Sequence, residues 1–451
     1  MNDIITRYRL GDIDGSALVR SGRQLEFARI LEYDAPRCYT HSKQKRVTTG
    51  VSCLDLDPTT GRLLLSCGDD GSVSLWSLDE KLSRSDGRLY SKRINYEARN
   101  RDLDPVLTPS AKRIKISLQE PRMVHNFETK LNKFRMYRQS SSSTTDAFQG
   151  MVNEPSGHTQ GHHYAITSAK WYAVDSGMFF TGSSDCKVKI WDTEAFEAVQ
   201  EIDLGYRINQ LDTETDGSYI IAATEDVYPR LLDLRTVVSS GITNLSHDKM
   251  NSEILCCKTN PTKPHIVSTG NAHGKVQLWD LRMANRQLRA LTQPGSDQAH
   301  YKNCNDMCWD ETGTTLTTTG TDGKCLVWSP FGTKLAPPVQ IGPVDLMRNR
   351  YRKRTSQRLL RMDKFIIHNT DYADIQIFET QQRKLWNKID LPTSFSNVKN
   401  PSTKKLASFF TGMAIQRNMT NSTGIRLYLA TNAPNADQGN GCIYEYLPSI
   451  I

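Results

Sequence analysis

Short runs of alternating apolar and polar residues recur along the chain and predict β-strands. They are clearest in residues 164–196, where ITSAKW, MFFTGSS and KVKIWD follow one another with a turn before each. A turn aspartate, Asp185, is followed six residues later by Trp191, near the end of its strand. We expect a four-stranded antiparallel sheet here. Because a sheet of this size cannot bury both faces alone, it must stack on similar sheets.

The spacing from the turn residue to the late aromatic residue recurs elsewhere in the sequence. Three clear copies place these two residues at Asp70 and Trp76, at Asp322 and Trp328, and at His273 and Trp279. Weaker copies end on Leu232, Phe378 and Tyr446. Together, these units predict an all-β fold, a seven-bladed WD-repeat β-propeller formed by residues 25–451.

Two segments before the first blade do not fit the repeat. Residues 1–24 carry scattered apolar side chains among polar ones and predict a short helical arm, which either packs on the propeller or inserts into a partner. The arm's candidate contact residues are Ile4, Ile5, Tyr8 and Leu10. Residues 25–33 (LEFARILEY) have the pattern of a strand, which would close the ring by pairing with the last blade.

Residues 79–161 are charged and polar, with a serine and threonine run at 140–145. This composition predicts a disordered or loosely ordered insertion between blades one and two. Within it, Lys112, Arg113 and Lys115 are typical of a basic nuclear-import signal, although an ordinary solvated charge run would have the same composition.

Composition limits the class of protein. The chain has 451 residues, 37% of them hydrophobic, and a formal net charge of +8. It has no apolar run long enough to cross a membrane, and its N-terminus lacks the apolar core of a signal peptide. The ten cysteines are scattered without zinc-site spacing, so we expect buried free thiols in a reducing compartment and no metal.

The distribution of charge is more informative than the net charge. Residues 348–361 are rich in arginine, and Arg350, Arg352 and Arg354 are candidates for contact with nucleic-acid phosphates or for a second import signal. Only Tyr351 could stack on a base, so a plain solvated loop is the alternative.

Histidine, hydroxyl, aspartate and tryptophan side chains are expected to form a buried network in each regular repeat. In the second blade, either His162 or His163, with His163 as the chosen candidate, would bond Asp185, with a strand serine or threonine and Trp191 completing the set. Asp70 with Trp76 and Asp322 with Trp328 would do the same in their blades. The same residue types could form a catalytic set, but the repeat spacing already accounts for them.

No catalytic motif or cofactor loop is present in the sequence. We therefore expect a binding protein that is not an enzyme and needs no cofactor. The sequence VQLWDLR ends in Arg282, two residues after Asp280, where a guanidinium could contact a partner's carboxylate or carbonyl groups. Arg235 holds the same place in the preceding repeat. The alternative is a surface arginine that pairs within the propeller.

Several of these stretches resemble the Cockayne syndrome protein A family of WD-repeat proteins. The similarity is clearest in YAITSAKWYAVDSGMFFTGSSDCKVKIWDTEAF, HIVSTGNAHGKVQLWDLR and NDMCWDETGTTLTTTGTDGKCLVW, and it includes the arm and the first blade. The resemblance implies a nuclear substrate receptor of a cullin-RING E3 ubiquitin ligase that acts in transcription-coupled nucleotide excision repair.

The resemblance also implies particular partners. A triple-propeller damaged-DNA-binding adaptor would bind Trp279, Asp280 and Arg282 together with the arm, while stalled RNA polymerase II and a Swi2/Snf2-type ATPase would be further partners. His273 departs from the acidic residue usual at its position, which bears on the strength of adaptor docking. Two alternatives stay open: a WD-repeat scaffold of another nuclear complex, in chromatin or ribosome assembly, and a nucleic-acid-binding propeller that uses the arginine-rich loop.

Overall fold

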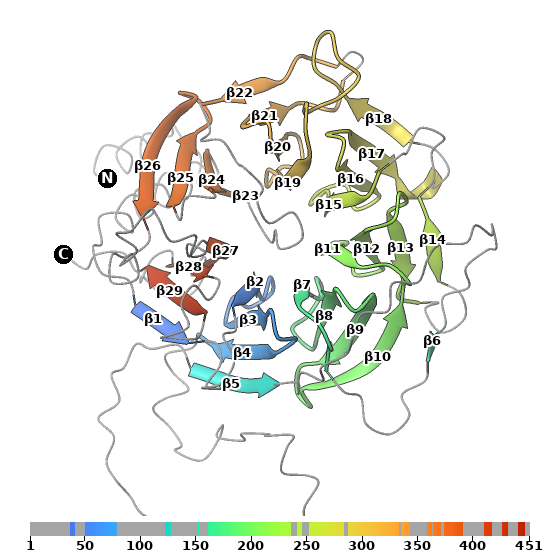
Figure 1. Ribbon diagram of the computed structural model, residues 1–451, viewed down its shortest axis with the longest axis vertical. Helices are drawn as coiled ribbons and strands as arrows, with labels where there is room; N and C mark the ends of the chain where they lie inside the picture. Colours follow the sequence, from blue (N-terminus) through green and yellow to red (C-terminus); the bar gives the residue numbers. More distant parts are fainter. Residues whose placement is uncertain are drawn as a thin grey trace, which may run out of the picture.

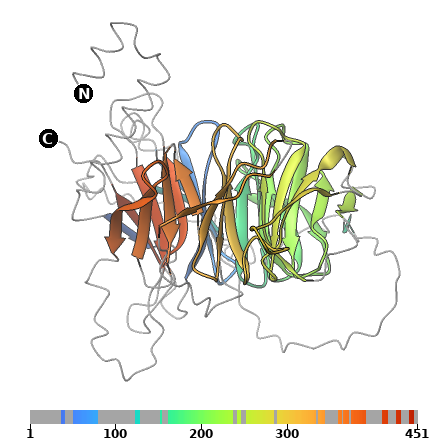
Figure 2. The same cartoon turned by 90° about the horizontal axis from the view of Figure 1, so that it is seen from above.

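The computed structural model forms a ring of seven antiparallel sheets, arranged as blades around a central axis (Figure 1). In the perpendicular view the ring is a flat disc, with the strands running through its thickness (Figure 2). The structure describes the following residues: 37–40, 50–78, 122–127, 152–153, 161–235, 241–245, 252–283, 287–332, 335–342, 359–362, 364–370, 374–390, 410–416, 426–431 and 441–446. The predicted fold class, a seven-bladed WD-repeat propeller, is confirmed.

Each blade begins with its innermost strand and ends at the outer edge. Blade one consists of β2 (Val51–Leu56), β3 (Leu63–Gly68), β4 (Val73–Ser77) and β5 (Arg122–Phe127). Blade two consists of β7 (Ile166–Trp171), β8 (Met178–Ser183), β9 (Lys187–Asp192), β10 (Glu197–Asp203) and an added outer strand, β6 (Val152–Asn153). Blade three consists of β11 (Ile208–Thr213), β12 (Tyr219–Thr224), β13 (Arg230–Asp233) and β14 (Ile242–Asn244).

The remaining blades repeat this order. Blade four consists of β15 (Ile254–Thr259), β16 (Ile266–Asn271), β17 (Val276–Asp280) and β18 (Gln287–Leu291), with a 3-10 turn, η3 (Leu281–Met283), after β17. Blade five consists of β19 (Cys304–Trp309), β20 (Leu316–Gly320), β21 (Cys325–Trp328) and β22 (Val339–Ile341). Blade six consists of β23 (Leu359–Met362), β24 (Phe365–Asn369), β25 (Asp374–Glu379) and β26 (Lys384–Asp390). Blade seven consists of β27 (Phe410–Gln416), β28 (Arg426–Thr431), β29 (Cys442–Tyr446) and β1 (Arg37–Thr40).

The ring closes through a strand from before blade one. β1 pairs antiparallel with β29, with Arg37 opposite Glu445 and Thr40 opposite Cys442. A closing strand was predicted, but at residues 25–33; the strand that pairs with β29 is Arg37–Thr40, and residues 25–33 lie outside the described residues. The helical arm predicted over residues 1–24 lies outside them too. Because β1 covers the edge of blade seven, the N-terminal and C-terminal parts of the chain are joined in one sheet.

Two strands come from the segment predicted to be a disordered or loosely ordered insertion. β5 is the outermost strand of blade one, with Val73 opposite Phe127, and β6 pairs with the outer strand of blade two. The prediction therefore needs correction at Arg122–Phe127 and Val152–Asn153. The reason is that the exposed edges of β4 and β10 offer unpaired backbone N–H and C=O groups, which a polar segment can satisfy without an apolar pattern.

Most of the apolar core lies between neighbouring blades. Between blades one and two, Phe179 stacks on Trp191 with ring centroids 5.7 Å apart and an interplanar angle of 6°. Trp171 meets Phe179 edge-on, and Leu65 and Leu75 of blade one complete this cluster. A single blade would leave these side chains in water, so the blades stabilise one another by stacking.

The late tryptophans are fixed by a hydrogen bond that recurs in four blades. Each indole N–H donates to the hydroxyl of a serine or threonine ten residues earlier, on the neighbouring strand. The pairs are Trp76 with Ser66 (2.9 Å), Trp191 with Thr181 (2.7 Å), Trp279 with Thr269 (2.8 Å) and Trp328 with Thr318 (2.9 Å). The weaker repeats bury an apolar or aromatic residue at the same position, as predicted: Leu232, Phe378 and Tyr446.

Candidate functional site at the rim and inner wall of the propeller

The predicted histidine network exists in blade two, but its histidine is His162. The buried His162 ring places Nδ1 2.9 Å from Asp185 Oδ2 and Nε2 2.7 Å from Thr181 Oγ1. His163 is exposed and contributes only its backbone N–H, which donates to Asp185, so its prediction is corrected. The turn before β7 is the reason, because it directs the first histidine inward and the second outward.

The protonation states in this network follow from the geometry. Burial lowers the pKa of His162 despite the neighbouring carboxylate, while the pKa of Asp185 is lowered, against the effect of its own burial, by His162 and two backbone N–H groups. A neutral ring that carries its proton on Nδ1 donates to Asp185 and accepts from Thr181 at Nε2. Thr181 in turn accepts the indole N–H of Trp191. Every polar atom therefore has a complementary partner, and the set is structural.

Blade five repeats this network, whereas in blade four an asparagine takes the place of the histidine and aspartate pair. His300 lies 3.1 Å from Asp322 and 2.9 Å from Thr318, the residue that also accepts from Trp328. In blade four, Asn271 accepts the backbone N–H groups of the turn. His273, in the place of the turn aspartate, is exposed.

The arginine of the WD-x-R sequence, Arg282, pairs with Asp280 of its own blade, and its contact with a partner stays a prediction. Arg282 lies in η3, directly after β17, and its side chain is 67% exposed. Nε donates to Asp280 Oδ1 at 2.9 Å and Nη2 to Asp280 Oδ2 at 2.6 Å, so the contact is bidentate. These bonds lower the pKa of Asp280. An exposed guanidinium held in one orientation is prepared to bind acceptors of a partner.

The other two rim candidates, Trp279 and Arg235, differ in their exposure. Trp279 is fully buried in the cluster between blades three and four, so it supports the rim and cannot touch a partner. Arg235 is exposed, but its Nη2 donates to Ser218 Oγ at 2.6 Å, so it is oriented differently from Arg282. Of the two arginines, Arg282 is therefore the one whose guanidinium is held by two hydrogen bonds to a carboxylate.

Several predicted residues lie outside the described residues. They are the arm positions Ile4, Ile5, Tyr8 and Leu10, the import candidates Lys112, Arg113 and Lys115, and the loop residues Arg350, Arg352 and Arg354. The structure describes the last residues of the arginine-rich stretch, which form part of β23. There, Arg361 Nη1 donates to Thr315 and Thr317 of blade five, so this arginine belongs to the blade interface.

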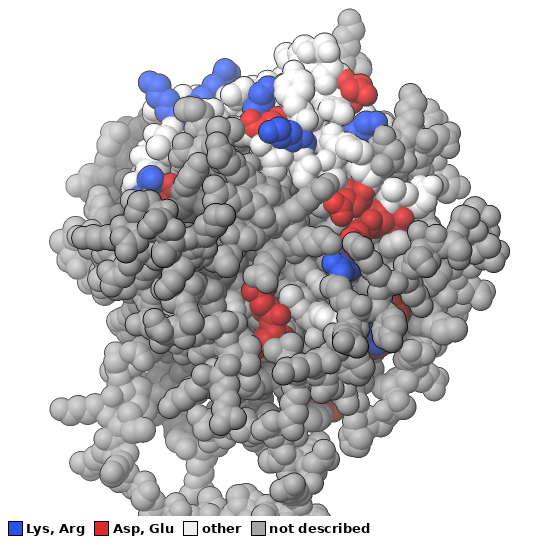
Figure 3. Space-filling view, in the orientation of Figure 1, with Lys and Arg blue, Asp and Glu red and all other residues white. Residues whose placement is uncertain are grey.

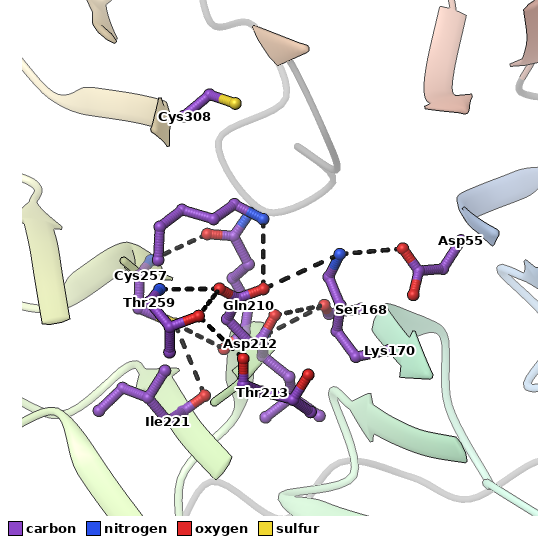
Figure 4. Close-up of polar contacts among 12 residues, drawn as sticks. Asp55, Ser168, Lys170, Gln210, Asp212, Thr213, Ile221, Cys257, Thr259 and Cys308 are labelled. Atoms are coloured by element: carbon purple, nitrogen blue, oxygen red, sulfur yellow. Dashed lines mark hydrogen bonds and ion pairs between the residues drawn. The ribbon is translucent and has the colours of Figure 1, made fainter. Parts of the chain in front are cut away.

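A second candidate site, absent from the predictions, lies on the inner wall of the ring. The fifth residue of each of four consecutive inner strands is charged, with alternating sign: Asp55, Lys170, Asp212 and Lys258. We call these four residues the Asp–Lys arc. Figure 4 shows Lys170 between the carboxylates of Asp55 and Asp212. The signal was available in the sequence, because VSCLDL, ITSAKW, INQLDT and ILCCKT align at this position.

The arc connects blades one to four. Lys170 Nζ lies 2.9 Å from Asp55 Oδ1 and 3.8 Å from Asp212 Oδ1, and Lys258 Nζ lies 3.6 Å from the same Asp212 oxygen. The second oxygen of each aspartate accepts a backbone N–H of the next blade, from Trp171 and Thr259 respectively. Burial alone would lower the pKa of Lys258, but the surrounding carboxylates raise it, so this lysine is charged.

The arc and Arg282 lie toward the same end of blade four. β15 and β17 are both antiparallel to β16, so they run in the same direction. Lys258 is opposite Ser268, which is opposite Leu278, four residues before Arg282. A partner that covers this end of the ring could therefore meet both sites.

Within the described ranges, no group of His, Cys, Asp or Glu has the geometry of a metal site, and no helix is long and apolar enough to span a membrane. The cysteines whose side chains are described are free thiols; all of them are buried, as predicted, except Cys186 and Cys308, which are partly exposed. Figure 3 shows basic side chains near the outer edge beside β22 and β26, with acidic ones both among them and nearer the centre. On that face the described residues form no continuous basic track.

Comparison with known proteins agrees with the fold. The family model "WD domain, G-beta repeat" matches residues 38–77, 153–192 and 292–329. These matches and the seven blades define a WD-repeat propeller protein. Radiation-sensitive protein 28 of Saccharomyces cerevisiae is 40% identical over 511 aligned positions, which cover 98% of this chain and 99% of that protein. The chain therefore belongs to the Cockayne syndrome protein A family of DNA-repair WD-repeat proteins.

Two other relatives match over shorter stretches. WD repeat-containing protein ATCSA-1 of Arabidopsis thaliana is 33% identical over 130 residues, 28% of each chain. Histone-binding protein MSI1 of Saccharomyces cerevisiae is 24% identical over 189 residues, 40% of this chain and 42% of its own length.

Proposed function

We propose that this chain is a non-catalytic substrate receptor of a nuclear cullin-RING E3 ubiquitin ligase that acts in transcription-coupled nucleotide excision repair. Its relationship to radiation-sensitive protein 28 supports the role in repair. A rigid ring of seven blades, which presents loops on both faces, supports a role in holding other proteins together. The single observation that carries the ligase role is the orientation of Arg282 at the rim of blade four.

Arg282 has the properties of an interface anchor. Asp280 holds its Nε and Nη2 groups, and no described residue bonds Nη1, so this edge of the guanidinium is available to acceptors of a partner. The bidentate contact also fixes the side chain before binding, which reduces the entropy lost when a partner arrives. The triple-propeller damaged-DNA-binding adaptor is the partner that the family resemblance implies, with Ile4, Ile5, Tyr8 and Leu10 as further contacts.

The remaining partners are proposed on the same resemblance. Stalled RNA polymerase II and a Swi2/Snf2-type ATPase would bind parts of the ring away from the adaptor rim. Nuclear import would use Lys112, Arg113 and Lys115, and its test is the location of a fluorescent fusion in which these residues are neutralised.

Affinity purification from the source organism, followed by mass spectrometry, tests the ligase role. Wild type, Arg282→Ala and Arg235→Ala are compared. We expect adaptor and cullin peptides with wild type and with Arg235→Ala, and a marked loss with Arg282→Ala. If wild type recovers only chromatin or ribosome-assembly proteins, the chain is a scaffold of another nuclear complex and the ligase role is wrong.

A further inference from the structure

The Asp–Lys arc has hydrogen-bond donors in excess. Each lysine ammonium has three N–H donors. Lys170 uses one of them on Asp55 at 2.9 Å, whereas Lys258 makes no hydrogen bond within the described part of the chain, its nearest carboxylate oxygen being 3.6 Å away. Both side chains are largely buried, with 20% and 15% exposed. An ammonium shielded from water gains by binding an acceptor from outside.

The carboxylates of the arc have little capacity left. Asp55 bonds Lys170 through one oxygen and the Trp171 N–H through the other. Asp212 Oδ2 accepts both the N–H and the hydroxyl of Thr259, and its Oδ1 faces the two lysines. The four charges of the arc sum to zero. The neighbouring Asp306 adds a carboxylate that acts on Lys258, but its oxygens already accept N–H groups of Gln210, Met307 and Leu359. The arc therefore presents unfilled donors to a ligand. It should therefore bind an acceptor group and not a cation.

The equivalent positions on the other side of the ring are not charged. Blades five, six and seven place Cys308, Leu360 and Ala414 in the same register. Burial raises the pKa of Cys308, so this thiol is neutral. The inner wall is thus half polar and half apolar at this level, which suits a ligand with a carboxylate next to an aliphatic side chain.

We propose that the inner wall of the ring binds an acidic peptide segment of a partner protein, with one carboxylate between Lys170 and Lys258 and a neighbouring aliphatic side chain facing the partly exposed Cys308 and Leu360. A nucleic-acid strand fits less well, because its successive phosphates would meet the carboxylates of Asp55 and Asp212. The inference goes beyond the adaptor contact at Arg282 and does not depend on it.

A peptide-binding experiment tests the proposal with the full chain. The probes are fluorescent hexapeptides on a Gly/Ser frame that carry Glu-Leu or Asp-Leu, together with Gln-Leu and Asn-Leu counterparts. We expect saturable binding of the acidic peptides, at least about tenfold weaker binding of the amide counterparts, and a similar loss with Lys258→Met. Lys302→Met, which removes an exposed lysine outside the arc, serves as the control and should bind like wild type.

Lys258→Met removes one of the two ion pairs of Asp212, which could destabilise the fold. A second variant therefore separates misfolding from loss of binding. The double variant Asp212→Asn/Lys258→Met keeps the arc neutral and is expected to fold and still fail to bind. Three results would overturn the proposal: amide peptides that bind as well as acidic ones, undiminished binding by the double variant, or no binding of any acidic peptide. Competition of labelled oligo-dT for the same lysines would instead identify a nucleic-acid site.

Discussion

Trp191 donates its indole N–H to the hydroxyl of Thr181 at 2.7 Å, and the same Thr181 oxygen lies 2.7 Å from Nε2 of His162. One hydroxyl therefore joins the late tryptophan of a blade to the histidine that precedes its first strand. All three side chains are buried. This relationship explains why the repeat keeps a fixed spacing from the hydroxyl to the tryptophan.

Replacing Thr181 should cost more stability than the size of its side chain suggests. Thr181→Val removes the hydroxyl that both the buried Trp191 N–H and His162 Nε2 bond, and we expect the free energy of unfolding to fall by about 3 kcal/mol. Thr181→Ser keeps the hydroxyl and should lose about 1 kcal/mol. Denaturant unfolding of the two variants measures this difference; equal losses would show that the hydroxyl is unimportant.

The same network should make the protein sensitive to mild acid. Burial lowers the pKa of His162 from its ordinary value of 6.5, so between that value and the folded pKa the unfolded chain binds a proton that the folded chain does not. Unfolding then takes up a proton, and stability falls as the pH falls below about 6.5. Asp185, with its lowered pKa, adds a second loss below 3.8.

Unfolding measured from pH 7.5 to pH 5 checks this account. His162→Gln removes the titrating ring and should give a shallower dependence on pH, while His163→Gln, at the exposed neighbour, should behave like wild type. An unchanged slope in His162→Gln would contradict the assignment.

Gly270 should not tolerate a side chain. A Cβ there would lie 2.7 Å from the sulfur atoms of both Cys256 and Cys304 and 2.9 Å from Met307 Cε. We expect Gly270→Ala to reduce the free energy of unfolding by about 1–3 kcal/mol. Adding Cys256→Ala removes one of the two sulfur clashes and should recover part of the loss, which a double-mutant cycle detects; strict additivity would argue against direct packing.

The closing blade contains a buried ion pair. Arg426 Nη1 lies 3.3 Å from Glu445 Oε1, and the hydroxyl of Tyr428 lies 3.2 Å from the same oxygen. Glu445→Gln removes a negative charge beside the buried Arg426 guanidinium, and we expect a loss of about 3–5 kcal/mol in the free energy of unfolding. Combining it with Arg426→Met should be less harmful than the sum of the two single changes; a double variant as unstable as that sum would contradict the pairing.

The sequence predicted the parts of the fold that repeat in both pattern and chemistry. The spacing from Asp185 to Trp191 and from Asp322 to Trp328 reflects a buried network, so both the blades and their core could be predicted. β5 and β1 are outer strands that pair along one edge and need no regular apolar pattern, so one was placed inside an insertion and the other was assigned to residues 25–33.

The candidate sites were predicted unevenly for a similar reason. Arg282 follows a recognisable strand end, so its exposure could be expected. Trp279 was assigned to the same contact, but it is buried and donates its indole N–H to Thr269. The Asp–Lys arc was missed because its members lie far apart in the sequence. They meet only when the inner strands of four blades are aligned around the ring.

Direct binding to the purified triple-propeller adaptor is the decisive measurement for the proposed role of Arg282. Isothermal titration with wild type, Arg282→Ala and Arg282→Lys compares the intact anchor, its removal, and a charge that cannot make the bidentate contact to Asp280. We expect a measurable Kd for wild type, about thirtyfold weaker binding for Arg282→Ala and an intermediate value for Arg282→Lys. Equal affinity in all three proteins, or no binding by wild type, would contradict this role.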